Sequence, residues 1–239
     1  MKNITFKVAD FTVSYNNEIK NFDILLRNFI CDSVVPDVSL DISMEDIEYE
    51  KNGDIGNVSH GSIQRLTAFR KLAEWLPLHN AFVLHSACFD VDGVGIAFAA
   101  HSGTGKTTHM LNWQKVLGDK MTVVNGDKPI IRFFDDEPNI PYAYGTPWNG
   151  KEHFGCNMRT QLKHICFIER SETNFVEKVD KAAVVDKIFN QVYMPKDPVA
   201  VMKTMELIDK LLSCCELWKI HCNMDISSAQ TAINAILNV

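Results

Sequence analysis

The sequence predicts an α/β domain built around a phosphate-binding loop, preceded by a small β-rich region at the N-terminus. An apolar strand pattern runs directly into a glycine-rich loop, which is followed at once by a helical pattern. Strand-like alternation of apolar and polar residues occupies the first part of the chain. The 239 residues are 46% hydrophobic and 23% charged, a composition typical of a globular protein with a sizeable core.

The N-terminal region shows the period-two alternation of half-buried strands. Apolar residues alternate with polar ones between Ile4 and Val8, and again between Val38 and Ile42. Turn-forming Asn, Gly and Asp residues then cluster between Lys51 and Asn57. We therefore expect a small β-rich region at 1–57 and a kinase-like α/β domain with the phosphate loop at 58–239.

The second region alternates strand-like and helix-like segments. A helix is predicted at 62–75, with Ser62 as its cap, and a helix at 107–117 that ends at Gly118. Two apolar runs, 81–84 and 95–99, are expected to be strands joined through a hairpin-like turn at 90–93. Further elements are expected at 121–124, 130–134 and 165–168 as strands, and at 182–191, 200–212 and 227–237 as helices.

The strongest functional signal is the loop between the run 95–99 and the helix at 107–117. Its glycines allow the backbone to curl so that N–H groups point inward, and the helix N-terminus adds a partial positive charge. The strict motif begins with glycine, whereas this chain has Ala100. A chance match in a linker is disfavoured by the flanking strand and helix. The residues expected to bind the phosphates of a nucleotide are Ser102, Gly103, Thr104, Gly105, Lys106, Thr107 and Thr108.

Two residues of the loop have further expected roles in catalysis and metal binding. The Lys106 ammonium is expected to reach the β- and γ-phosphates of ATP, and the Thr107 hydroxyl to bind Mg²⁺. Sites of this kind usually add a carboxylate at the end of a neighbouring strand, and Asp127 follows the apolar run 121–124. The alternative is that 125–127 is only a turn, because Asn-Gly is a favoured turn dipeptide. Both interpretations are compatible, since such a turn is where this aspartate would lie.

Two other segments carry little signal by composition alone. His85 ends the run 81–84, and a single histidine at a strand end is more often a packing residue than a catalytic one. The segment 145–151 contains glycine, proline and asparagine, which predicts a turn-rich surface loop. No functional role is predicted for His101 and His109, which lie in and beside the glycine loop.

A resemblance to known families favours a functional role for His85 and for the segment 145–151. The run from Leu84 through His85 and Ser86 to Lys106 resembles the core of HPr kinase/phosphorylase, which has a histidine at the same offset before its phosphate loop. The loop also resembles that of ATP-dependent phosphoenolpyruvate carboxykinases. The chain more closely resembles a bacterial branch of HPr kinase-related proteins, some of them associated with peptide-modification gene clusters. The resemblance covers most of the chain and implies the shared fold of HPr kinase and the carboxykinase C-terminal domain.

The resemblance also implies roles for individual residues. It places His85 in the phosphoryl-transfer site and Asp127 in the metal site. Lys151 and Arg159 are the further cations expected near the phosphates, where Lys151 could neutralise charge on the transferred group; a solvated surface position is an equal alternative for Arg159. Relatives have two adjacent aspartates where this chain has Gly126 followed by Asp127. Either His85 or Asp127 then serves as the base, or transfer is impaired.

Composition excludes several other classes of function. A formal net charge of -6 disfavours the basic surface that nonspecific nucleic-acid binding needs. No run of about eighteen apolar residues predicts a membrane span, and the N-terminus lacks a signal-peptide core, so the cytoplasm is the expected compartment. Seven cysteines without a CxxC pair predict reduced thiols and no metal site. Self-association is left open.

The predicted function is phosphotransfer of the HPr kinase type, dependent on ATP and Mg²⁺, to a hydroxyl of a protein, a peptide or a small molecule such as a free amino acid. The carboxykinase reaction is not expected, because the chain lacks room for the large substrate-binding domain of that enzyme. The alternative is a nucleotide-binding regulatory or scaffold protein of a peptide-modification system, in which Gly126 marks weakened catalysis.

Overall fold

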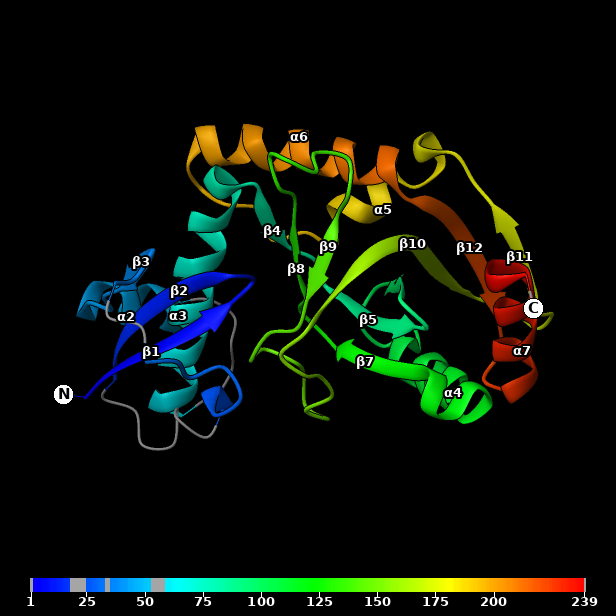
Figure 1. Cartoon of the computed structure of the whole chain (residues 1–239), viewed down its shortest axis with the longest axis horizontal. Coiled ribbons are helices and arrows are strands. Elements are labelled where there is room, and N and C mark those ends of the chain that lie inside the picture. The colour runs from blue at the N-terminus through cyan, green and yellow to red at the C-terminus, as the bar shows by residue number, and fades with distance from the viewer. Residues whose placement is uncertain (1, 18–24, 33–34, 53–58, 239) are drawn as a thin grey trace.

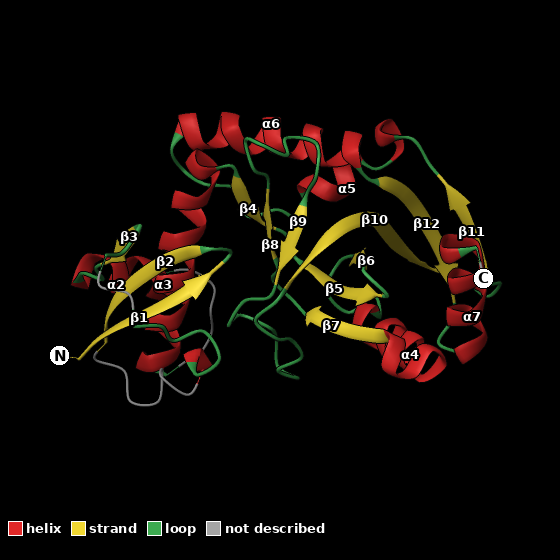
Figure 2. Ribbon diagram, in the orientation of Figure 1, coloured by secondary structure: helices red, strands yellow, loops and turns green. Residues whose placement is uncertain are grey.

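The computed structural model describes residues 2–17, 25–32, 35–52 and 59–238 as a mixed α/β fold with one large and one small sheet (Figures 1 and 2). The expected boundary between the regions 1–57 and 58–239 lies outside the described residues. None of the described helices combines the length and the apolar character that a membrane crossing requires.

The small sheet forms where the period-two pattern predicts strands. β1 (Lys2–Val8) pairs antiparallel with β2 (Phe11–Asn17), and β2 pairs in parallel with β3 (Val38–Leu40). The sheet packs on α3 (His60–Trp75), which the helical spacing predicted at 62–75. A short helix that was not expected, α2 (Met44–Lys51), begins at a capping box.

The large sheet has nine strands and is mixed. Its order is β4-β8-β9-β10-β6-β5-β7, and β12 pairs with β10 and β11. The strands are β4 (Ala81–Val83), β5 (Ser86–Val91), β6 (Val94–Ala99), β7 (Met121–Asn125), β8 (Ile130–Arg132), β9 (Tyr142–Tyr144), β10 (Arg159–Arg170), β11 (Phe175–Lys178) and β12 (Glu216–Cys222). β10 holds the sheet together, since its start pairs with β9 and its remainder lies between β6 and β12.

The expected hairpin between the runs 81–84 and 95–99 is wrong. The turn at 90–93 instead joins β5 to β6, and β4 pairs with β8 in another part of the sheet. Strand β5 was missed because its residues are almost all buried, so no alternation marks it. The predicted helix at 182–191 is also shorter, with a 3₁₀ turn η3 (Lys181–Ala183) before α5 (Val185–Phe189).

Helices cover both faces of the large sheet (Figure 1). One face packs against α5 and α6 (Pro198–Cys214), with Ile188, Ile208 and Leu211 among the buried contacts. The other packs against α4 (Lys106–Leu117) and α7 (Ile226–Leu237). Trp113 of α4 is fully buried against Phe89 and Phe98. The glycine loop, between β6 and α4, is therefore held at both ends by well-packed elements.

Candidate functional site

The glycine loop occupies the short connection between β6 and α4. Gly103 and Gly105 have φ values of +78° and +114°, a region that residues with a side chain rarely adopt. Gly105 is the N-cap of α4 and provides no side-chain acceptor for the first N–H groups of the helix. The loop is thus suited to an anion, which these N–H groups and the helix dipole would stabilise.

Lys106 is the first residue of α4 and is only 9% exposed. Its Nζ donates a hydrogen bond to the Ala100 carbonyl oxygen at 2.5 Å, so the ammonium is folded back over the loop. Burial lowers the pKa of Lys106, and the nearby Asp127 carboxylate opposes that effect. A lysine held in this way would gain from a phosphate beside it, because the phosphate replaces lost hydration.

Asp127 and His85 form a pair beside the loop. His85 Nε2 lies 3.2 Å from Asp127 Oδ1, and Lys128 Nζ lies 3.1 Å from Asp127 Oδ2. Burial by itself would raise the pKa of Asp127, but the hydrogen bond from His85 and the charge of Lys128 lower it to about 2. Asp127 is therefore a carboxylate at neutral pH, and its Oδ1 is placed to accept a hydrogen bond from His85 Nε2–H.

Backbone hydrogen bonds hold this pair in register. The N–H of Ser86 donates to the Asp127 carbonyl oxygen at 2.9 Å, and the N–H of His85 donates to the Gln191 carbonyl oxygen at 2.6 Å. Strand β5 starts immediately after His85, and β7 ends two residues before Asp127. Because β5 and β7 are neighbours, with Cys88 opposite Asn125, the two side chains meet.

Asn125 builds the turn that carries Asp127. Its side chain is fully buried, and its Oδ1 accepts hydrogen bonds from the N–H groups of Asp127 and Lys128 at 2.9 and 2.7 Å. Its Nδ2 donates to the backbone oxygen and to Oγ1 of Thr146 at 3.2 and 2.9 Å. The predicted turn therefore carries the predicted site aspartate. The hydrogen bonds from Asn125 to Thr146 attach this turn to the segment 145–151.

Gly150 lets the segment 145–151 lie against Asp127. Its φ is +83°, and a Cβ at this position would lie only 3.2 Å from Asp127 Cβ. The close approach carries Lys151 and Glu152 to the rim of the same cavity. The segment is thus a structured wall of the site rather than a detached surface loop.

A cavity of about 460 Å³ unites most of the expected residues. Of the predicted set, the cavity is lined by His85, Ser102, Gly103, Gly105, Lys106, Thr107, Thr108, Asp127 and Lys151. Thr104 lines an adjoining cavity instead. Arg159 lines neither: it begins β10, at the end of the strand remote from the loop, where it contacts Tyr144 and Asp10.

Three lining residues had no sequence signal. Arg170, at the other end of β10, donates hydrogen bonds to the carbonyl oxygens of Gly103 and Thr104. Glu152 and Met224 complete the wall. Only the pairing of β10 with β6 brings Arg170 to the loop, and no local pattern encodes that pairing.

The adjoining cavity is larger, about 640 Å³, and shares Gly105, Thr108, Arg170 and Met224 with the first. It is formed by α4 and the ends of β10 and β12, and its wall includes the buried His109. Burial lowers the pKa of His109 to about 4, so the ring is neutral. Because the two cavities share these lining residues, they are adjacent parts of one site at the glycine loop.

Metal binding at this site would depend on a ligand as well as on protein groups. The described residues contain no cluster of three or more His, Cys, Asp or Glu side chains able to hold a metal ion. The seven cysteines are unpaired thiols, as expected. Thr107 and Asp127 do line one cavity, and Mg²⁺ is commonly held by one or two protein oxygens together with substrate phosphates. The donor set therefore fits Mg²⁺ that arrives with a nucleotide.

Comparisons with known proteins do not show a family for this chain. No protein-family model matches the chain, and no curated protein matches its sequence. Among solved structures, the chain is similar to the Hpr(Ser) kinase/phosphatase from Coxiella burnetii, with a TM-score of 0.38 and 9% sequence identity. The match covers 65% of this chain and 97% of that one. The chemistry of the site has to be inferred from its own residues.

Proposed function

We propose that the chain is a phosphotransferase that moves the γ-phosphoryl group of Mg²⁺-ATP to a hydroxyl group. One observation carries the proposal: the phosphate loop with Lys106 and the His85–Asp127 pair line one cavity. A phosphate-binding loop alone would support only nucleotide binding. A paired histidine and aspartate beside it provide the proton acceptor that transfer to a hydroxyl needs.

The presence of two adjoining cavities at the glycine loop supports a nucleotide as the donor. The triphosphate lies over the N-terminus of α4, where N–H groups and Lys106 stabilise its charge. The nucleoside extends into the 640 Å³ cavity, past Met224 and along Asn112 and Ile168. Asn112 is held by a hydrogen bond from its Nδ2 to the Met224 carbonyl oxygen, which leaves its Oδ1 to accept from the nucleoside.

Thr107 and Asp127 would hold Mg²⁺ that arrives with the donor. When bound, the ion would supply charge neutralisation for the phosphates. Asp127 suits this role because its low pKa keeps it ionised at every physiological pH.

The transfer step requires a base and cations. His85 Nδ1 accepts the hydroxyl proton, while Asp127 holds the Nε2–H and stabilises the imidazolium that forms. The acceptor oxygen then bonds to the γ-phosphorus, the bond from phosphorus to the β,γ-bridging oxygen breaks, and ADP leaves. Lys106, Lys151 and Arg170 stabilise the charge on the transferred group. This is the activity that the resemblance to HPr kinase implies.

The test combines nucleotide binding with phosphate transfer. Calorimetry measures Mg²⁺-ATP affinity, and γ-labelled ATP measures hydrolysis and transfer to a set of hydroxyl-containing peptides and amino acids. Lys106→Ala should lower affinity or turnover by at least about tenfold, since a charge-assisted bond to phosphate is lost. Lys115→Ala, which removes an exposed lysine of the same helix, is the matched control.

Each outcome decides between the candidates. Turnover that Lys106→Ala abolishes supports the phosphotransferase. Binding of ATP without any turnover indicates a nucleotide-binding scaffold instead. Unchanged affinity and turnover in a folded Lys106→Ala variant would show that the glycine loop is not part of the nucleotide site.

A further inference from the structure

A third cavity lies on the other side of the loop 149–155 from the phosphate site. Its volume is about 460 Å³, and it is lined by Leu25, Arg27, Asn28, Phe29, Arg65, Asn149, His153 and Gly155. Asn149 faces this cavity, whereas the next residue, Gly150, faces the phosphate site. The backbone of the loop is therefore the common wall of the two cavities.

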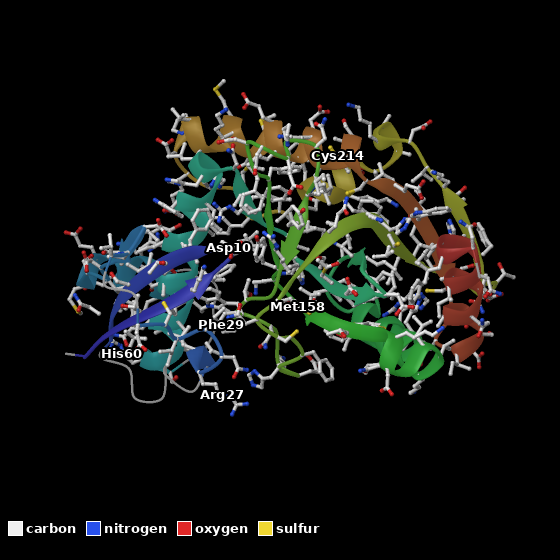
Figure 3. All side chains as sticks on the ribbon, in the orientation of Figure 1. Asp10, Arg27, Phe29, His60, Met158 and Cys214 are labelled. Atoms are coloured by element: carbon white, nitrogen blue, oxygen red, sulfur yellow. The ribbon has the colours of Figure 1, made fainter. Side chains whose placement is uncertain are left out.

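Three separately anchored segments build the cavity. Segment 25–31 is tied to β1, because the N–H of Lys7 donates to the Phe29 carbonyl oxygen at 2.7 Å. Arg65 projects from α3. The loop 149–155 is tied to the end of β7 by a hydrogen bond from the N–H of Gly126 to the Phe154 carbonyl oxygen at 2.8 Å. In Figure 3, Arg27 and Phe29 project from the segment that runs below β1 and β2.

The charge of this cavity is opposite to that of the whole chain. The chain has a net charge of -6, yet the described residues that line the cavity include Arg27, Arg65 and His153 and no Asp or Glu. Neither arginine forms a salt bridge within the described part of the chain; Arg65 donates only to Ser62 Oγ. Two unpaired guanidinium groups at one cavity are suited to carboxylates, which they bind in a bidentate manner.

The phosphate site would not attract an anionic group of the acceptor once the donor is bound. Its cations then face the triphosphate, and its carboxylates Asp127 and Glu152 would repel such a group, while the cations on the other side of the loop would attract it. A ligand that places a hydroxyl at His85 and an anion at Arg27 must cross the loop. The thickness of one chain is roughly 5 Å, about two residues of extended polypeptide.

We propose that this cavity binds the acceptor and that the acceptor is an acidic polypeptide segment. It presents a hydroxyl at His85 and, a few residues away, a carboxylate side chain to Arg27 and Arg65. The inference rests on the proposed phosphotransferase function but is tested by binding, without turnover. A free hydroxy amino acid, which is shorter than two residues of extended polypeptide, is not expected to reach both cavities.

The test measures the binding of fluorescent peptides by anisotropy in the absence of nucleotide. The probes are peptides with a central serine whose flanking positions carry either Asp and Glu or Asn and Gln. We expect the acidic set to bind on the order of tenfold more tightly, because each lost charge-assisted contact is worth about that factor. Arg27→Gln/Arg65→Gln should abolish the difference, and Lys115→Gln should preserve it.

The outcomes separate this inference from the proposed function. Equal binding of both peptide sets, binding of neither, or an acidic preference that survives in Arg27→Gln/Arg65→Gln would overturn the inference. Displacement of a labelled acidic peptide by equimolar succinate would also overturn it, since a small dianion would then suffice. Mg²⁺-ATP affinity, measured on the same double variant, should equal that of the unmodified chain. A chain that prefers acidic peptides but does not turn over ATP would refute the phosphotransferase and leave the peptide site standing.

Discussion

Replacement of Asn125 by alanine tests how the site is held together. The side chain is fully buried and makes four hydrogen bonds, two to backbone N–H groups of the turn and two to Thr146. A typical intramolecular hydrogen bond contributes about 1 kcal/mol net, so the free energy of unfolding should fall by about 4 kcal/mol. The N–H groups of Asp127 and Lys128 lose their acceptor, which adds to that loss wherever water cannot replace it.

Urea denaturation, followed by tryptophan fluorescence, measures this change. The control is Asn190→Ala, which removes one exposed hydrogen bond at the end of α5 and should cost less than about 0.5 kcal/mol. The variant should also bind Mg²⁺-ATP more weakly at temperatures where it remains folded, because the turn no longer fixes Asp127. A loss below about 1 kcal/mol, with unchanged Mg²⁺-ATP affinity, would show that the turn does not depend on Asn125.

Three further predictions concern titratable groups of the site. Asp127→Asn should weaken ATP binding in the presence of Mg²⁺ more than in its absence, as measured by calorimetry; an equal loss would contradict a metal role. His85→Ala should lower kcat on the order of a hundredfold or more with nearly unchanged nucleotide affinity, and normal turnover per folded molecule would make His85 a packing residue. Between pH 6.5 and about 4, His109 binds a proton in the unfolded chain but not in the folded chain. The free energy of unfolding of the protein should therefore fall by about 3 kcal/mol as the pH decreases through this range. His109→Gln should show a smaller fall in the same urea titrations, and an identical fall would exclude His109 as the cause.

The glycine loop could be predicted because its signal is local. A strand, two glycines, a lysine and a helix follow one another without interruption, and all of them take the predicted conformation. The helices at 107–117, 200–212 and 227–237 were predicted to within two residues at each end, since apolar spacing and caps are also local. Strand β12 was missed, because the sheet rather than the sequence spacing determines which of its residues are buried.

The pairing of His85 with Asp127 could not be predicted from spacing. Each residue was expected in the site on a separate ground, but their contact depends on β5, which the sequence pattern did not reveal. Arg159 shows the converse case. A position near the phosphates and a solvated surface position were equal alternatives for it, and the structure favours the surface position, because β10 runs away from Arg159 and delivers Arg170 to the loop instead. A fully extended strand of twelve residues spans roughly 35 Å, so its two ends lie in different parts of the sheet, a separation invisible in the local sequence.

The structure indicates a packing role for Gly126, which the sequence did not suggest. The sequence-based hypothesis treated it as the position of a missing carboxylate. A Cβ at Gly126 would lie 3.2 Å from Phe154 Cβ and 3.3 Å from the Asn149 carbonyl oxygen, so a side chain here would point into the loop 149–155. The absent side chain therefore allows the loop to pack against the end of β7 and to bring Glu152 to the cavity. Because Glu152 Oε2 and Asp127 Cγ both lie within 4 Å of the position that a Cβ of Gly150 would occupy, the loop itself gives the site its second carboxylate.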